Sequence, residues 1–321
     1  MAIYYLNVKS FSRSTGGRAT SAAAYRSGER IRDERSGQVF DHSRRTDVMH
    51  KAILLPAKLS AADMGWAQDR AMLWNAAELA ETRKNAMVAR EYLVALPHEL
   101  THVQRLDLVQ RFSQDLADRH GFAVDFAIHA PRPHNDPRNF HAHVLTTTRE
   151  VSPTGLGAKS NLDIGFQRRQ ERGLGSTLKE LYAVRERWAR MTNDALKDAN
   201  LEVRVDHRSL KAQGIDREPG PRMPVGAWHS ERLGQKSDIA EKIRAAYRAR
   251  VDARAQRALA RAAGMGGGAG KLEDVRRIAR ESWLLLQRVA AAAPDDARPQ
   301  ARDLKKDCDA GRKERDDDLA L

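Results

Sequence analysis

The feature that most constrains the fold is a pair of β-strand patterns, 122–130 and 139–149, joined by a short Pro-, Asn- and Asp-rich stretch. The first reads FAVDFAIHA and the second NFHAHVLTTTR, and both contain many of the aromatic and β-branched residues that strands favour. Prolines in the stretch between them favour a turn, and so short a connection joins strands that are neighbours in a sheet. We therefore predict an adjacent, antiparallel pair of strands.

Strand and helix patterns alternate along the rest of the first two thirds of the chain. Further strand patterns lie at 2–9, 50–56, 89–97 and 202–207. Helix patterns include an Ala-rich segment around Tyr25, 60–85, 101–121 and 167–199. The order β-α-β-α-β-α-β-β-α predicts the α+β class, with a central antiparallel-type sheet flanked by helices.

The character of the sequence changes after about residue 225, and we predict three regions. Residues 1–225 form the sheet domain. Residues 226–295 form a basic helical extension, interrupted at 264–270 by a Gly-rich linker. Residues 296–321 are dense in charge and poor in large apolar side chains, which predicts a disordered tail.

The charge balance favours a polyanionic partner. The chain carries 56 Lys and Arg against 43 Asp and Glu, a formal net charge of +13. Basic side chains that neutralise phosphates release condensed counterions, so DNA is the expected partner, although a basic protein need not bind nucleic acid. A single cysteine, Cys308, allows no disulfide framework and predicts a cytoplasmic location. The longest apolar run, near 283–293, is shorter than the roughly 20 residues that span a bilayer, so no membrane insertion is expected.

Histidines cluster in the predicted hairpin, where four of the chain's 11 histidines fall within 15 positions. His141 and His143 are two residues apart, so a strand would direct both imidazoles to one face of the sheet. His129, at the end of the preceding strand pattern, would join them through hairpin pairing, and His134 in the connecting loop is the alternative third ligand. Three imidazoles would hold a divalent metal ion and leave positions open for catalysis. Ordinary surface or structural histidines are the competing interpretation.

A second histidine pattern is expected to be a chance match. His98, Glu99 and His102 spell the zinc-protease motif H-E-x-x-H, which works when both histidines lie on one helix. Pro97 precedes the motif, and the helix signals begin at Thr101, with Gln104 completing a capping box. His98 would therefore lie before the helix, so a zinc protease remains only a minor alternative.

Tyr25 is the candidate nucleophile, because small residues surround it in TSAAAYRSGER. Arg18, Arg26 and Arg30 lie near it in sequence and would favour phosphate and the phenolate form. An ordinary core aromatic is the alternative. Arg149 and Lys159 are further candidate phosphate contacts, and as solvated surface charges they would be unremarkable.

Several stretches together resemble the MobA/MobL (MobQ-type) plasmid relaxases of the HUH endonuclease superfamily. They are the N-terminal strand, the tyrosine at position 25 after a Ser-, Gly- and Arg-rich stretch, YLVALPHEL, the FAIHA and NFHAHVLTTTR pair, ERWARMTNDAL and VDHRSLKAQGIDREPGPR. The resemblance covers about residues 1–225. The gap from His129 to His141 is longer than in the short-loop members of the family, and His134 falls within it.

The resemblance implies an HUH relaxase-like fold and a specific reaction. Tyr25 would attack one DNA strand at a plasmid origin of transfer and form a covalent 5′-phosphotyrosyl intermediate. His129, His141 and His143 would hold the metal, expected to be Mg²⁺ or Mn²⁺, and Glu91 would orient a ligand imidazole or assist proton removal. An accessory mobilisation protein and a type IV secretion coupling protein are expected partners. A replication initiator or transposase with the same chemistry, or a non-enzymatic DNA-binding protein, is the alternative.

Overall fold

The computed structural model describes residues 2–132 and 136–262, which divide into two compact units, Met1–Arg208 and Ser209–Leu321. The first unit ends before residue 225, to which we expected the sheet domain to extend. The predicted linker at 264–270 and tail at 296–321 lie outside the described residues, as does His134.

The first unit is built on a central sheet in which the described neighbouring strands pair antiparallel. The strands follow the order β1-β5-β7-β6-β4, and β8 pairs with the far end of β7. Their bounds are β1 Leu6–Ser12, β4 Val48–Leu54, β5 Met87–Leu96, β6 Phe122–His129, β7 Phe140–Ser152 and β8 Gly155–Lys159. A separate hairpin consists of β2 Arg30–Arg32 and β3 Val39–Asp41. The predicted α+β class and the β6–β7 pairing are confirmed.

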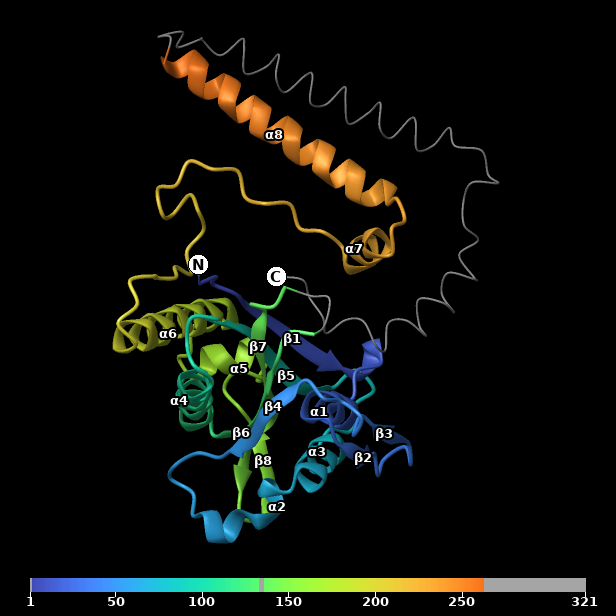
Figure 1. Ribbon diagram of the computed structural model, residues 1–321. Helices are drawn as coiled ribbons and strands as arrows, with labels where there is room; N and C mark the ends of the chain where they lie inside the picture. The colour runs from blue at the N-terminus through green and yellow to red at the C-terminus, as the bar shows by residue number, and fades with distance from the viewer. Residues whose placement is uncertain (1, 133–135, 263–321) are drawn as a thin grey trace. The chain divides into compact units, whose positions relative to one another are not determined.

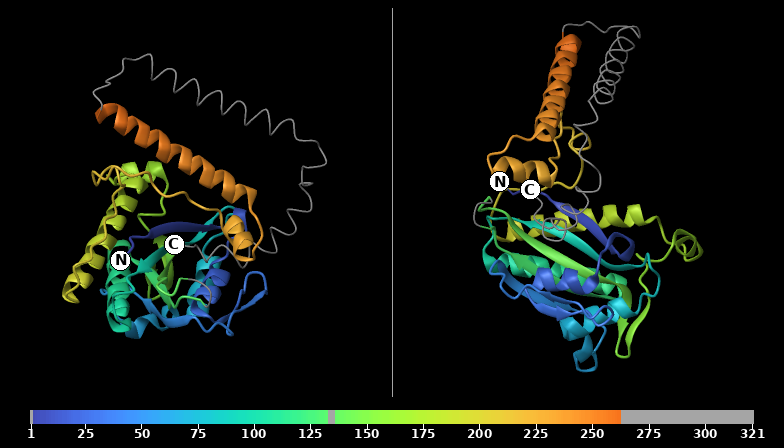
Figure 2. Two further views of the ribbon diagram at one scale, coloured as in Figure 1. Left: turned by 45° about the horizontal axis from the view of Figure 1, so that its top comes forward. Right: turned by 90° about the vertical axis from the view of Figure 1, so that its right-hand side faces the viewer.

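Helices cover both faces of the sheet (Figures 1 and 2). The helices of the first unit are α1 Ala19–Ser27, α2 Gly65–Gln68, α3 Arg70–Leu79, α4 His102–His120, α5 Phe166–Glu171 and α6 Thr177–Asp198, with short 3₁₀ turns at Arg13–Thr15 and Ala61–Met64. On one face, α4 and α6 bury Phe112 and Trp188 against sheet residues such as Val144. On the other face, α1 and α3 pack Trp74 and several alanines against residues such as Leu145.

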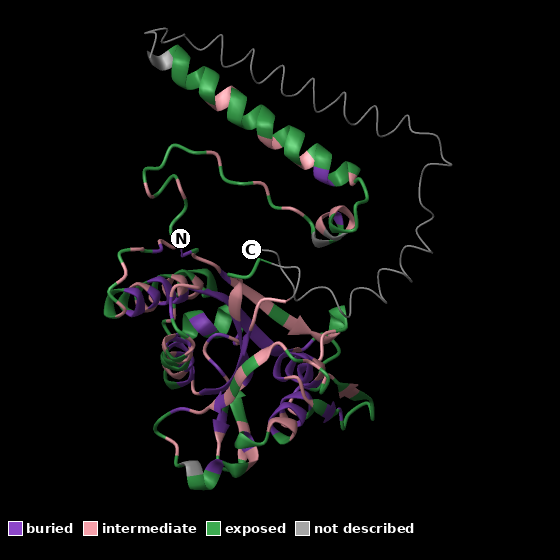
Figure 3. Cartoon of the chain, in the orientation of Figure 1, coloured by how far each residue is buried: buried purple, intermediate pink, exposed green. Residues whose placement is uncertain are grey.

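The alternation along β7 therefore decides what each of its side chains contacts. Ala142 and Val144 belong to the core beneath α4 and α6, whereas Leu145 belongs to the core beneath α1 and α3. His141 and His143 share the second face, because side chains alternate along a strand. Figure 3 shows the buried residues gathered along the sheet and on the inner faces of the helices.

Three predicted elements differ from the structure. The single helix pattern at 167–199 is divided into α5 and α6 around Gly173, whose φ of 65° lies in the left-handed region that glycine tolerates. The pattern at 60–85 is likewise divided, and Asp69 caps the start of α3 by accepting from Met72 N. The strand predicted at 202–207 is absent, and these residues are irregular. The backbone N–H and carbonyl of Val205 bond to the side chain of Asn193 on α6 instead of to another strand.

The second unit contains two described helices, α7 Val225–Arg232 and α8 Asp238–Ala262. Ion pairs link α8 to α7 and to the preceding segment, through Arg244–Glu231 and Arg250–Glu218. Among the described residues, no helix combines the length and apolar character that a membrane span requires.

Candidate active site

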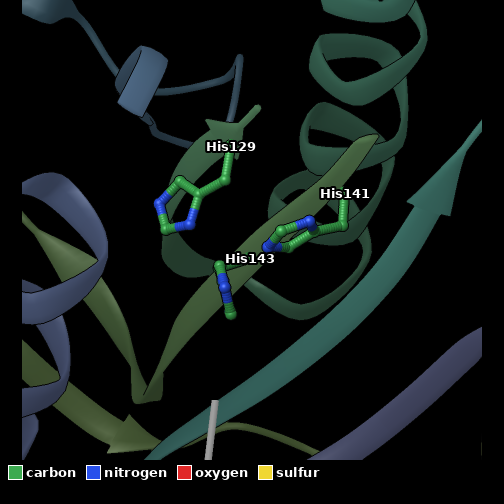
Figure 4. Close-up of side chains that lie close together, drawn as sticks. All are labelled: His129, His141 and His143. Atoms are coloured by element: carbon green, nitrogen blue, oxygen red, sulfur yellow. The ribbon is translucent and has the colours of Figure 1, made fainter. Parts of the chain in front are cut away.

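His129, His141 and His143 come together at one end of the β6–β7 pair, and we call them the triad (Figure 4). His129 ends β6 and pairs in register with His141 near the start of β7. The ring centroids of His129 and His143 lie 4.7 Å apart, and each lies 5.3 Å from that of His141. One ring nitrogen from each residue lies within 4.8 Å of the others. The geometry suits one small cation.

Each triad imidazole has one ring nitrogen held by an acceptor outside the triad. His143 Nδ1 lies 2.7 Å from Glu91 Oε1, and His141 Nδ1 lies 3.1 Å from the carbonyl of Asn139. His129 Nε2 lies 2.8 Å from the carbonyl of Arg26. An acceptor at one nitrogen places the proton there and leaves the other nitrogen with a lone pair for a metal; at His129 this lone pair faces the Arg45 guanidinium, which a bound metal would replace.

The electrostatics of the triad also favour ligation. Burial and the neighbouring His143 lower the pKa of His141 to about 4, and the same two causes lower the pKa of His129. Both imidazoles are therefore neutral at physiological pH, which is the form that binds a metal. An all-nitrogen donor set fits a divalent transition ion better than Mg²⁺, which prefers oxygen ligands.

Glu91 lies on β5, buried between His143 and Arg26. Burial alone would raise the pKa of this carboxyl, but the charge of Arg26 and the hydrogen bonds from His143 and Arg26 hold it well below its usual range. An ionised, fully engaged carboxylate can fix the orientation of His143, and this favours the orienting role expected for Glu91 over proton removal. Arg26 is itself buried and donates to Glu91 through Nη2 at 3.0 Å. The expectation that Arg26 contacts DNA is therefore corrected: its guanidinium neutralises a carboxylate inside the protein.

Tyr25 lies near the C-terminal end of α1 and is 9% exposed. Its hydroxyl accepts a hydrogen bond from Arg132 Nη2 at 2.9 Å. The guanidinium of Arg45 lies over its ring, 4.1 Å from the centroid, and Nη2 of the same arginine is 3.3 Å from His129 Nδ1. One side chain thus contacts both the candidate nucleophile and a candidate metal ligand. His42 packs edge-on against the tyrosine, with ring centroids 5.1 Å apart.

Asp47, just before β4, holds the two arginines at Tyr25. Its carboxylate accepts from Arg45 at 2.6 and 2.8 Å and from Arg132 at 3.3 Å. Burial alone would raise the pKa of Asp47, but the hydrogen bonds and charge of Arg45 hold it well below its usual range. These residues were absent from the expected site, because their role depends on loops that meet only in the folded chain. The arginine- and aspartate-rich strings HSRRTD and PRPHNDP are the only local signal.

The other candidate DNA contacts lie apart from the triad or are paired. Arg149 and Lys159 both contact Glu81 Oε1 at 2.7 Å, near the far end of β7. Six residues separate His143 from Arg149, about 20 Å along an extended strand. Arg18 donates to Ser36, and Arg30, in the β2–β3 hairpin, lies 3.7 Å from Asp41.

The H-E-x-x-H pattern is not arranged as a metal site. Helix α4 begins at His102, with Thr101 and Gln104 forming the expected capping box, so His98 lies outside it. His98 Nδ1 instead contacts Glu99 Oε2 at 3.1 Å. Within residues 2–132 and 136–262, the triad is the one group of His, Cys, Asp and Glu side chains spaced to hold a metal ion.

Comparison with known proteins agrees with this architecture. The model of the MobA/MobL family matches residues 18–232. Mobilization protein MobL of Acidithiobacillus ferridurans is 38% identical over 262 residues, covering 74% of this chain and 66% of that protein. Probable mobilization protein MobA of Bifidobacterium longum (strain NCC 2705) is 34% identical over 269 residues, covering 74% of this chain and 46% of that protein. The chain thus spans about half to two thirds of the length of these two relatives.

A solved structure, reported as "Molecular Basis of Vancomycin Resistance Transfer in Staphylococcus aureus", is also similar. It is 29% identical, with a TM-score of 0.52, and the match covers 65% of this chain and 100% of that chain. The family match includes Tyr25, Glu91 and the whole triad, and it spans most of the first unit. The chain belongs to the MobA/MobL family.

Proposed function

We propose that this chain is a DNA relaxase, which nicks one strand at a plasmid origin of transfer and remains attached to it through Tyr25. The observation that carries the proposal is the link made by Arg45, which contacts the Tyr25 ring and the triad residue His129. A nucleophile and a metal site so connected can act on one phosphate. The net charge of +13 and the names of the mobilization relatives support DNA as the substrate and transfer as the process.

The proposed reaction exchanges one phosphoester for another. A bond forms between Tyr25 Oη and the scissile phosphorus while the bond from phosphorus to the 3′ oxygen breaks. The phenol loses a proton and the departing 3′ oxygen gains one. The phosphoester energy stays in the covalent protein–DNA bond, so the strand can later be resealed.

Each part of the site has a proposed task in this exchange. His129, His141 and His143 would hold the divalent ion, which when bound would stabilise negative charge on the phosphate oxygens. Glu91 would keep His143 oriented, and the partners of the other two imidazoles would fix theirs. Mn²⁺ suits the three nitrogens better than Mg²⁺. Arg18 and Arg30 remain proposed DNA contacts, and a cytoplasmic location, an accessory mobilisation protein and a coupling protein belong to the same proposal.

Nicking of supercoiled plasmid tests the proposal. The protein is incubated with Mn²⁺ or Mg²⁺ and a plasmid carrying the cognate origin of transfer, with a plasmid lacking it as control. We expect relaxed DNA with covalently bound protein, and none from Tyr25→Phe. Nicking that survives Tyr25→Phe would reject the nucleophile. Binding without nicking under any metal would favour a non-enzymatic DNA-binding protein, and cleavage only at a replication origin or transposon end would favour those alternatives.

A further inference from the structure

Arg132 contacts the atom on which the proposed reaction turns. Its Nη2 donates a 2.9 Å hydrogen bond to the hydroxyl oxygen of Tyr25. Arg132 follows β6 by three residues, whereas Tyr25 lies on α1, so the contact joins segments more than a hundred residues apart in sequence. No expectation from the sequence gave Arg132 a role.

Asp47 holds the Arg132 guanidinium in place. Its carboxylate lies 3.3 Å from Arg132 Nε, which shares one edge of the guanidinium with the Nη2 that donates to Tyr25. The backbone fixes the same two segments, because Ala130 N donates to the carbonyl of Asp47 at 2.8 Å. Arg132 therefore reaches Tyr25 from an anchored backbone and through a planar group whose Nε is held by a carboxylate. Its side chain is still 38% exposed, which leaves room for a substrate.

We propose that Arg132 is a catalytic residue whose guanidinium stabilises negative charge on Tyr25 Oη, with Asp47 as its positioning residue; this inference rests on the proposed function. During cleavage the charge develops as the phenol proton leaves and Oη approaches the phosphorus. During resealing the 3′ hydroxyl loses its proton and its oxygen bonds to phosphorus, the bond from Oη to phosphorus breaks, and Oη again carries the charge until it takes up a proton. One guanidinium serves both directions, because both pass through the same charged oxygen.

Arg132 and the metal ion would stabilise charge on different atoms. The triad would place its ion near the phosphate, whereas Arg132 bonds directly to the nucleophile oxygen. Hydrogen bonds from a charged donor are about twice as strong as neutral ones, and a planar arginine holds two acceptors in a fixed relative geometry that the rotatable ammonium of a lysine does not impose. Arg45 covers the ring of Tyr25 and bonds its backbone carbonyl, so it positions the tyrosine without touching Oη.

Single-turnover kinetics with saturating protein test the role of Arg132 after the DNA is bound. We expect Arg132→Ala to slow cleavage and resealing each by about 100-fold, with Arg132→Lys intermediate and DNA affinity changed less than threefold. Arg138→Ala is the matched control: this arginine lies in the same connection, is 62% exposed and pairs with Asp136 at 2.6 Å. It should cleave at the wild-type rate once bound. A loss in Arg132→Ala that appears only in DNA affinity, or only in cleavage and not in resealing, would overturn the proposal.

A measurement without DNA separates this inference from the proposed function. The absorbance difference between each protein and its Tyr25→Phe counterpart follows ionisation of this one phenol. The lowered pKa values of His129, His141 and Asp47 keep the charges of these three neighbours constant across this alkaline titration. We expect Arg132→Ala to raise the midpoint by about one pH unit, with Arg138→Ala unchanged. An unshifted midpoint would overturn the role of Arg132 even if nicking depends on Tyr25. If Arg132→Ala shifts the midpoint but the Tyr25→Phe variant still nicks DNA, only the proposed function is rejected.

Discussion

The triad and the H-E-x-x-H pattern are two clusters of possible metal ligands with different arrangements. In the triad, two paired strands bring His129 and His141 into register, and the period of β7 adds His143 on the same face. In the second pattern, His98 precedes α4 and contacts its own neighbour, Glu99. The residues of the H-E-x-x-H pattern are closer together in the sequence than those of the triad, yet only the triad forms a possible metal site. What matters is the element that carries the spacing.

The two clusters also differ in what surrounds them. Every triad imidazole has an acceptor at its outer nitrogen, and one of these acceptors is the buried, ionised Glu91. His102 Nδ1, by contrast, is buried with no hydrogen-bond partner in the described structure. A metal site needs this surrounding support as well as its ligands. The comparison thus predicts that substitutions in the two clusters have very different effects.

The largest effect is expected from removing a ligand of the triad. His143→Ala should abolish measurable Mn²⁺ binding and lower nicking by about 1000-fold or more, because the metal would supply several kcal/mol of charge stabilisation. His102→Ala is the matched change in the other cluster and should nick at close to the wild-type rate. Calorimetric metal titration and plasmid nicking measure the two effects. Equal losses in both variants would remove the distinction between the clusters.

The next largest effect is expected at the support of the triad. Glu91→Gln should weaken Mn²⁺ binding by about 10- to 100-fold, because His143 loses a charged acceptor. It should also lower the melting temperature, since Arg26 is left in the interior beside a neutral group. Glu81→Gln is the control, because it also replaces a buried, paired carboxylate with a neutral amide. Glu81 pairs with Arg149 and Lys159 far along β7 from the triad. If both variants lose stability and bind metal equally well, Glu91 is structural only.

The site was predictable from the sequence where periodicity decides geometry. A strand directs residues two apart to one face, so the pairing of His141 with His143 followed from spacing alone. The role of His129 required the hairpin, which the short connection indicated. Tyr25 was a candidate from its small and basic neighbours, but only the family resemblance separated it from an ordinary core aromatic. Glu91 came from the resemblance alone, since an isolated glutamate has no local signal. On a helix, neighbours point about 100° apart, so Arg26 directs its guanidinium to Glu91, whereas the Tyr25 hydroxyl meets Arg132.

The remainder depended on contacts between distant segments. Arg45, Asp47 and Arg132 lie in connections whose conformations follow from packing, and their contacts span up to about a hundred residues. The β2–β3 hairpin and β8 were missed because such short strands have little periodicity to read. The pattern at 167–199 was predicted as one helix that included Gly173, although glycine weakens a helix interior. These errors concern boundaries and loops, and the order of the sheet-forming strands before β8 was unaffected.

A smaller effect is expected from pH. Protonation competes with metal binding. Because the pKa of His141 is lowered to about 4 and the pKa of His129 is lowered as well, these two imidazoles stay neutral down to about pH 5 and take up no competing proton. Three ordinary imidazoles with pKa values near 6.5 would lose about 1000-fold in affinity between pH 7.5 and 5.5. We therefore expect the loss to be about 100-fold smaller than that of three ordinary imidazoles, measured by calorimetry at the two pH values. A 1000-fold loss would show that the triad is as open to protons as an exposed histidine cluster.

The smallest effect is expected at His98. Its contact with Glu99 is partly exposed, and such pairs contribute about 0 to 1 kcal/mol. His98→Ala should therefore change the free energy of unfolding by less than about 1 kcal/mol and leave Mn²⁺ affinity and nicking within twofold of wild type. Denaturant unfolding, calorimetry and plasmid nicking provide the three measurements. If His98→Ala lost metal binding while His143→Ala retained it, the metal would bind at the H-E-x-x-H pattern, and its assignment to the triad would be wrong.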